Sequence, residues 1–235
     1  MSAILFDMGG VLLDFKGSPG LPEGKLDWRG REALLRFLRR RGAGLSADDL
    51  ERVFFGPWRT QFERRHELGR EADWAAHARR LRKLAGRGLR TPTVRLLNIW
   101  FRPLAEQVEV LPEALEVLEE CRRSGHRLAI VSNVALPGAL YKDLLRRHRL
   151  NRFFERMYFS YDEGHRKPSP AMVRRALADL GFDAADAWFV GDRRAIDVLA
   201  GRAAGVRTIW LRTDDGGGPE PDVTVDRLSD LIEVF

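Results

Sequence analysis

From residue 108 onward the chain alternates between short apolar runs and segments with helical periodicity. The runs at 127–132 (RLAIVS), 187–192 (AWFVGD) and 207–211 (RTIWL) are continuously apolar, which is typical of strands buried on both faces. Strands that alternate with helices in this way predict a parallel sheet with helices on both sides. The apolar run at residues 3–7 is expected to add a further strand to the same sheet.

The stretch between this first strand and residue 108 has a different pattern. Its apolar residues recur every three or four positions, and Ser46 precedes acidic residues as a helix N-cap would. We therefore predict an α/β domain formed by residues 1–16 and 108–235, into which a helical domain of residues 17–107 is inserted. The core of the insertion is expected to contain four tryptophans, namely Trp28, Trp58, Trp74 and Trp100.

Composition excludes several classes of protein. No apolar run is long enough to cross a membrane, and the single cysteine, Cys121, cannot form an internal disulfide, so we expect a cytoplasmic protein without membrane partners. The net charge of +6 is carried mainly by arginines interspersed with acids, which indicates solvated helix faces rather than a nucleic-acid site. Arg59, Arg64 and Arg65 are expected on such faces, with contact to an acidic substrate as the alternative. Monomer and homodimer both remain open.

Polar residues follow the predicted strands at the points where they end. Asp7 follows the first strand, Ser132 and Asn133 end the second, Lys167 lies in the loop after the third, and Asp192 follows the fourth. In an open parallel sheet, ligands bind beyond the carboxyl ends of the strands. We therefore expect these side chains to face one site.

The residue types at these strand ends fit a single site that binds a metal and an anion. Two nearby carboxylates require a cation, and oxygen ligands favour a hard ion such as Mg²⁺. Gly9 and Gly10 allow the backbone to approach a ligand closely, while a lysine and a serine hydroxyl can both bind an anion. A metal, a carboxylate nucleophile and a phosphate-binding group together indicate phosphoryl transfer through an aspartyl-phosphate.

Four segments in this order resemble the motifs of the haloacid dehalogenase (HAD) superfamily of hydrolases. They are ILFDMGGVL (4–12), LAIVSNVA (128–135), YDEGHRKPSP (161–170) and FVGDRRAIDVLAGRAAGV (189–206). The resemblance implies a Rossmann-like α/β core. It also implies that residues 17–107, inserted between the first two motifs, form a helical cap of the C1 type that covers the site and selects the substrate.

The resemblance assigns a role to each motif residue. Asp7 would be the nucleophile and a metal ligand, and Lys167 would stabilise the negative charge on the phosphoryl group. The other metal ligands would be the Gly9 carbonyl, Asp192 and Asp197. The phosphate would be held by Ser132, by the Gly9–Gly10 backbone and, at its edge, by Asn133.

One departure from the family pattern concerns the proton donor. Phosphatases of this family usually have a second acid two residues after the nucleophile, where this chain has Gly9. Loss of a positioned acid–base group typically costs ~10²–10⁴-fold in rate. We predict a Mg²⁺-dependent phosphatase acting on a small phosphate monoester. Either its substrates have good leaving groups or the acid comes from elsewhere in the chain; Asp14 is the candidate substitute, and a polar loop residue without a catalytic role is the alternative for it. The alternatives are a 2-haloacid dehalogenase, disfavoured because Asp192 and Asp197 are retained, and a non-catalytic phosphate-binding module.

Overall fold

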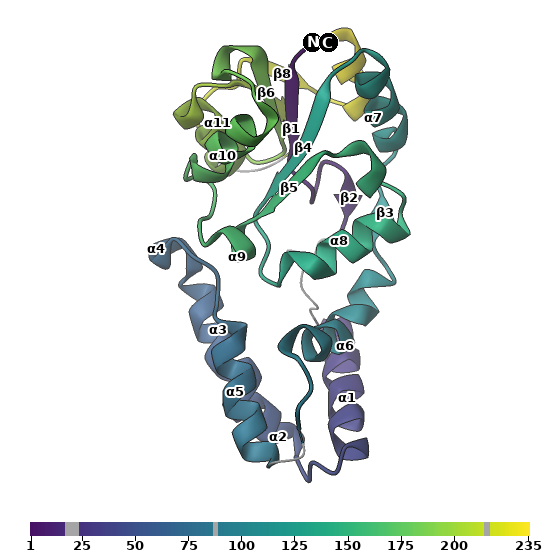
Figure 1. The fold of residues 1–235 in the computed structure, drawn as a ribbon, viewed down its shortest axis with the longest axis vertical. Coiled ribbons are helices and arrows are strands. Elements are labelled where there is room, and N and C mark those ends of the chain that lie inside the picture. Colours follow the sequence, from purple (N-terminus) through teal and green to yellow (C-terminus); the bar gives the residue numbers. More distant parts are fainter. Residues whose placement is uncertain (17–23, 87–88, 214–216) are drawn as a thin grey trace.

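A six-stranded parallel sheet lies in the upper half of the structure in Figure 1, a computed structural model that describes residues 1–16, 24–86, 89–213 and 217–235. The strand order is β5-β4-β1-β6-β7-β8. The strands are β1 (Ala3–Phe6), β4 (Arg127–Ser132), β5 (Arg156–Phe159), β6 (Ala187–Gly191), β7 (Arg207–Leu211) and β8 (Val223–Val225). The predicted parallel sheet is therefore confirmed, and β8 adds an edge strand that the sequence pattern did not indicate.

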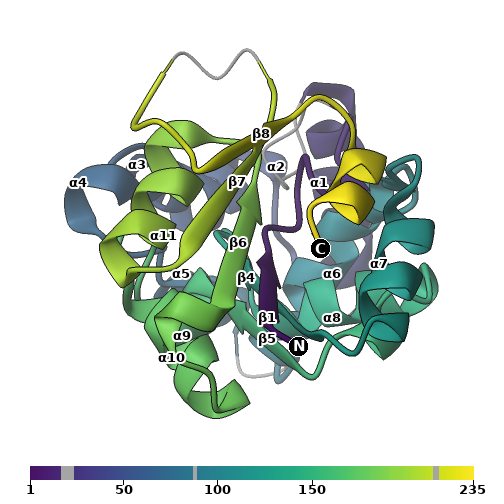
Figure 2. The same cartoon turned by 90° about the horizontal axis from the view of Figure 1, so that it is seen from above.

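Helices cover both faces of the sheet, as Figure 2 shows from above. Ile4 and Phe6 of β1 face one hydrophobic cluster with α7 and α8, whereas Ala3 and Leu5 face a second cluster with α10 and α11. The bounds of these helices are α7 (Ala114–Arg123), α8 (Gly138–Arg147), α10 (Ala171–Leu180) and α11 (Leu199–Ala204). Because successive residues of a strand point to opposite faces, burial on both sides requires the continuously apolar runs seen in the sequence.

The helices between β2 and β3 form a separate group beyond the edge of the sheet at which the strands end (Figure 1). They are α1 (Gly24–Arg40), α2 (Ala47–Leu50), α3 (Gly56–Glu63), α4 (Arg65–Leu68), α5 (Trp74–Ala85) and α6 (Thr93–Ala105), with a π-helical turn at Glu51–Phe55. Ser46 caps α2, since its side chain accepts a hydrogen bond from the Asp49 amide. The predicted boundary at residue 17 lies outside the described residues, and the division into two domains stays a prediction.

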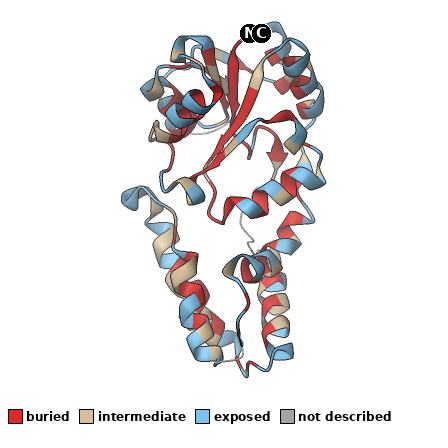
Figure 3. Ribbon diagram, viewed as in Figure 1, coloured by how far each residue is buried: buried red, intermediate tan, exposed pale blue. Residues whose placement is uncertain are grey.

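Buried residues lie along the helices of this group (Figure 3), and several of them are aromatic residues whose rings pack together. The rings of Trp58 and Trp74 are stacked with centroids 4.8 Å apart, and Trp100 lies 5.4 Å from Trp74. The prediction for Trp28 was wrong, because its side chain is 63% exposed. Trp28 lies two residues before Gly30, which contacts Trp100 at the buried face of α1, so the tryptophan projects from the opposite side.

A short antiparallel pair, which the sequence pattern did not indicate, joins the sheet to the helical group. It consists of β2 (Leu13–Asp14) and β3 (Glu109–Val110), so both crossings of the chain between the two parts run side by side. Lys16 fastens this pair through ion pairs with Asp14 and Glu109. Among the residues that the structure describes, every helix is too short or too polar to pass through a bilayer.

Candidate active site

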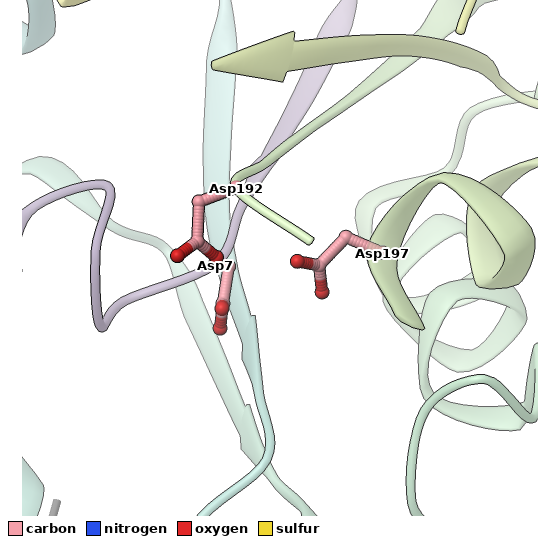
Figure 4. Close-up of side chains that lie close together, drawn as sticks. All are labelled: Asp7, Asp192 and Asp197. Atoms are coloured by element: carbon pink, nitrogen blue, oxygen red, sulfur yellow. The ribbon is translucent and has the colours of Figure 1, made fainter. Parts of the chain in front are cut away.

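Three aspartates converge at the carboxyl ends of two neighbouring central strands. Asp7 directly follows β1, Asp192 directly follows β6, and Asp197 lies in the π-helical turn Arg194–Val198 that precedes α11. Each offers a carboxylate oxygen, and these oxygens lie within 4.8 Å of one another (Figure 4). The parallel register of β1 and β6 brings together residues that are far apart in the sequence.

Lys167 is the counter-charge of this cluster and is 1% exposed. Its Nζ donates a hydrogen bond to the Val131 carbonyl at 2.8 Å and forms ion pairs with Asp197 at 2.6 Å and Asp7 at 3.0 Å. Burial by itself would lower the pKa of this lysine, but the charges of Asp197 and Asp7 outweigh that effect and raise its pKa. Lys167 therefore stays charged at neutral pH.

A single lysine does not balance three carboxylates. Burial, reinforced by the charges of Asp7 and Asp197, raises the pKa of Asp192 to about 8, and burial also raises the pKa of Asp197 against the effect of Lys167. Within the described part of the chain, the buried Oδ1 of Asp192 has no hydrogen-bond partner. Buried oxygen ligands with excess negative charge fit a divalent cation such as Mg²⁺.

The two glycines after Asp7 differ in what they contribute. Gly10 has a φ of +78°, and a Cβ there would lie 2.2 Å from Oδ2 of Asp192. Its N–H donates to the Leu13 carbonyl at 3.0 Å, so this amide is engaged within the turn. A Cβ at Gly9 would only touch the Phe15 ring at 3.5 Å, an ordinary contact. Space therefore requires glycine at position 10 but not at position 9.

Ser132 and Asn133 follow β4 and line the same site. Ser132 is 3% exposed and faces the cavity above the carboxylates. Both polar atoms of the Asn133 amide are occupied, since Nδ2 donates to the Lys167 carbonyl at 2.9 Å and Oδ1 accepts from the Lys167 amide at 2.8 Å. Asn133 thus fixes the backbone from which the Lys167 side chain reaches the aspartates.

A cavity of about 430 Å³ lies above the carboxylates. Besides the predicted residues, it is lined by Phe15, Phe62, Arg65, Tyr141, Arg166 and Arg193. Arg59 and Arg64 are exposed and paired with glutamates, as expected, whereas Arg65 is half-buried in the cavity wall. Sequence reasoning missed Arg166 and Arg193, although both lie in the segments that contain Lys167 and Asp192.

Residues 1–205 match the family model described as haloacid dehalogenase-like hydrolase. The chain belongs to this family. It is 39% identical over 126 residues to a phosphoserine phosphatase of Thermus thermophilus, a match that covers 53% of this chain and 49% of that protein. The chain spans about half the length of the curated relatives it matches.

Solved structures share the fold of this HAD-like hydrolase over nearly their whole length. An HAD phosphatase from Thermococcus onnurineus has a TM-score of 0.65 at 22% identity, covering 100% of this chain and 97% of that chain. A 2-haloacid dehalogenase from Pseudomonas syringae pv. Tomato DC3000 gives the same values of score, identity and coverage. The architecture is therefore common to both kinds of enzyme, and the residues of the site must distinguish between them.

A buried ion pair connects the helical group of this HAD-like hydrolase to the loop that contains Lys167. The Glu71 and Arg166 side chains are 3% and 8% exposed and form an ion pair. The Ser160 hydroxyl also donates to the Glu71 carboxylate at 2.6 Å. Sequence reasoning missed this contact, because no local pattern marks Glu71 as buried.

Asp14, the predicted substitute acid, does line the cavity. Its carboxylate accepts a hydrogen bond from the Lys16 amide at 2.6 Å and lies 3.3 Å from the Lys16 ammonium. Asp14 is thus within the site, and its carboxylate is engaged by the backbone amide and the ammonium group of Lys16.

Proposed function

We propose that this HAD-like hydrolase is a Mg²⁺-dependent phosphohydrolase that cleaves small phosphate monoesters. The main support for this proposal is that Asp7, Asp192 and the buried Lys167 lie together at the floor of the cavity. Phosphatase names among relatives with about half-length matches support the same chemistry. The retained metal-type carboxylates favour this function over 2-haloacid dehalogenation.

In the proposed reaction the Asp7 carboxylate attacks phosphorus while the bond from phosphorus to the ester oxygen breaks. The leaving oxygen takes up a proton, and water then cleaves the aspartyl-phosphate to restore Asp7 and release inorganic phosphate. Lys167 neutralises charge on the phosphoryl oxygens, and its ion pair with Asp197 holds its ammonium beside Asp7. Ser132 would hold another phosphoryl oxygen from the end of β4.

Asp7, Asp192 and the Gly9 carbonyl would hold Mg²⁺, and Asp197 would bind it through water or act only as the anchor of Lys167. The bound ion would supply electrophilic stabilisation of the phosphoryl group. The unpartnered buried oxygen of Asp192 supports this assignment. For the proton, we assign Asp14 of β2, which lines the cavity.

The helical segment 17–107 is proposed to act as a cap on the core formed by residues 1–16 and 108–235. Phe62 and Arg65 from this segment line the cavity together with residues of the sheet, which supports a role in excluding water and selecting the substrate. The single buried cysteine, Cys121, supports the proposed cytoplasmic location.

The direct test is phosphate release from p-nitrophenyl phosphate and alkyl phosphates with Mg²⁺ or EDTA. We expect EDTA and Asp7→Asn each to abolish release, while Asp143→Asn on the exposed face of α8 serves as the matched control. Metal-independent halide release from 2-chloropropionate would establish the dehalogenase instead. A folded protein that is silent on every substrate would indicate the phosphate-binding module.

The assignment of Asp14 has its own test. Asp14→Asn is expected to slow the hydrolysis of alkyl phosphates more than that of p-nitrophenyl phosphate, because only a poor leaving group depends strongly on protonation. Equal losses on both substrates would remove Asp14 from the mechanism.

A further inference from the structure

Arg65 occupies the wall of the cavity that comes from the helical segment, at the first residue of α4. Its Nη1 donates to the Phe62 carbonyl at 2.7 Å, and its guanidinium lies over the Phe62 ring, 3.7 Å from the centroid. Both residues line the cavity. The side chain is therefore held in place while most of its five N–H donors remain available.

The charged groups that act on Arg65 are mainly positive. Burial lowers its pKa, and the charges of Arg166 and Arg193 lower it further against the opposing charge of Glu71. Glu71 already forms an ion pair with Arg166. Across residues 1–16, 24–86, 89–213 and 217–235, neither Arg65 nor Arg193 forms an ion pair with a carboxylate. Arg65 is thus opposed by the charges of two other guanidinium groups, and the carboxylate of Glu71 that acts against them is already paired with Arg166.

The floor of the cavity, in contrast, has an excess of negative charge. There Asp7, Asp192 and Lys167 would receive the phosphoryl group and its metal. Two sites of different charge consequently border one cavity of about 430 Å³, a size suited to a small metabolite. Guanidinium groups bind carboxylate and phosphate with paired N–H donors, and an anion beside Arg65 would also relieve the repulsion among the three arginines.

We propose that Arg65, assisted by Arg193, binds a second oxyanion on the substrate, so that the preferred esters carry a carboxylate or a second phosphate besides the phosphate that is cleaved. This inference rests on the proposed function, because it names the substrate class of the same cavity. Arg65 is then a specificity-determining residue contributed by the helical segment.

The test compares kcat/KM for three esters of similar size. These are 2-phosphoglycolate, its amide in which a carboxamide replaces the carboxylate, and ethylene glycol bisphosphate. Charge-assisted hydrogen bonds predict that wild type prefers at least one oxyanion-bearing ester over the amide by about 10- to 100-fold. The ester that is preferred identifies the oxyanion as a carboxylate or a phosphate.

Arg65→Gln should reduce this preference at least tenfold, and Arg65→Lys should reduce it less because the positive charge is kept. Arg64→Gln is the matched control, since Arg64 is the adjacent residue but is exposed and paired with Glu67. Thermal unfolding checks that each variant is folded, and Arg65→Lys carries the test if Arg65→Gln does not fold. No preference in wild type, or the same preference in the Arg65 variants, would overturn the proposal.

Calorimetric binding of the same esters to Asp7→Asn separates the two proposals. Binding to Asp7→Asn that favours the oxyanion-bearing ester and depends on Arg65, together with no turnover of any ester by the wild-type protein, would refute the phosphatase but support this site. Turnover of all three esters at equal rates, whatever residue occupies position 65, would refute this site alone. Absence of both binding and turnover would refute both.

Discussion

Gly10→Ala tests how the acidic cluster is held in place. Gly10 has a φ of +78°, and a methyl group at this position would lie 2.2 Å from Oδ2 of Asp192 and 2.8 Å from its Cγ. The left-handed backbone alone costs a residue with a side chain on the order of 1–3 kcal/mol. In addition, the Asp192 carboxylate must turn away from the new methyl group.

The Asp192 carboxylate can turn away with little loss of contacts. The buried Oδ1 of Asp192 has no hydrogen-bond partner in the described part of the chain, so few contacts oppose rotation of the carboxylate away from Asp7. The loss should therefore appear mainly as weaker metal binding. Misplacement of a metal ligand by its neighbours typically lowers affinity about 10- to 100-fold, which we expect for Mg²⁺ and Gly10→Ala.

Calorimetric titration with Mg²⁺ measures this effect, and Gly9→Ala is the matched control. A Cβ at position 9 would meet only the Phe15 ring at 3.5 Å, and the φ of Gly9 is not in the left-handed region. We expect Gly9→Ala to bind Mg²⁺ within about threefold of wild type, since an ordinary contact shifts energies by about 0.5 kcal/mol or less. Wild-type affinity in Gly10→Ala, or an equal loss in both variants, would refute the reasoning.

Two further predictions concern stability and reactivity. Glu71→Gln leaves the charge of Arg166 buried without a partner, so urea denaturation should show that the free energy of unfolding falls by about 3 kcal/mol. The control Glu67→Gln, in an exposed ion pair, should lower it by less than about 1 kcal/mol. Similar small losses in both variants would contradict the prediction. Burial raises the pKa of the Cys121 thiol to about 12. Its reaction with a disulfide reagent at pH 8 should be at least about a hundredfold slower in native than in urea-unfolded protein, and rapid native labelling would exclude a buried thiol.

The parts of the fold that the sequence predicts are those determined by local patterns. The continuously apolar run of β1 anticipates burial on both faces, because Ile4 and Leu5 pack into different clusters on opposite sides of the sheet. Asp7 and Asp192 could be placed together because parallel strands end at one edge, whatever the exact loop geometry.

The parts that the sequence did not predict depend on how distant segments meet. Glu71 contacts Ser160 and Arg166, which lie 89 and 95 residues away, and nothing near Glu71 distinguishes it from an exposed glutamate. Arg65 has the same sequence environment as the exposed Arg64, and only its contact with Phe62 at the wall of the cavity separates them. Very short elements such as β8 carry too few residues for a periodic pattern.

Lack of space does not explain why position 9 has no acid, because the structure leaves room for a side chain there. Gly9→Asp would place a carboxyl group in the cavity wall beside Phe15, two residues from Asp7, at the position where related phosphatases usually have their acid. Since such a group typically contributes ~10²–10⁴-fold, we expect kcat/KM for alkyl phosphates to rise at least tenfold, with little change for p-nitrophenyl phosphate. The double variant Gly9→Asp, Asp14→Asn should keep that gain, because the new acid makes Asp14 dispensable. A loss on every substrate would instead mean that this site depends on an uncharged position 9.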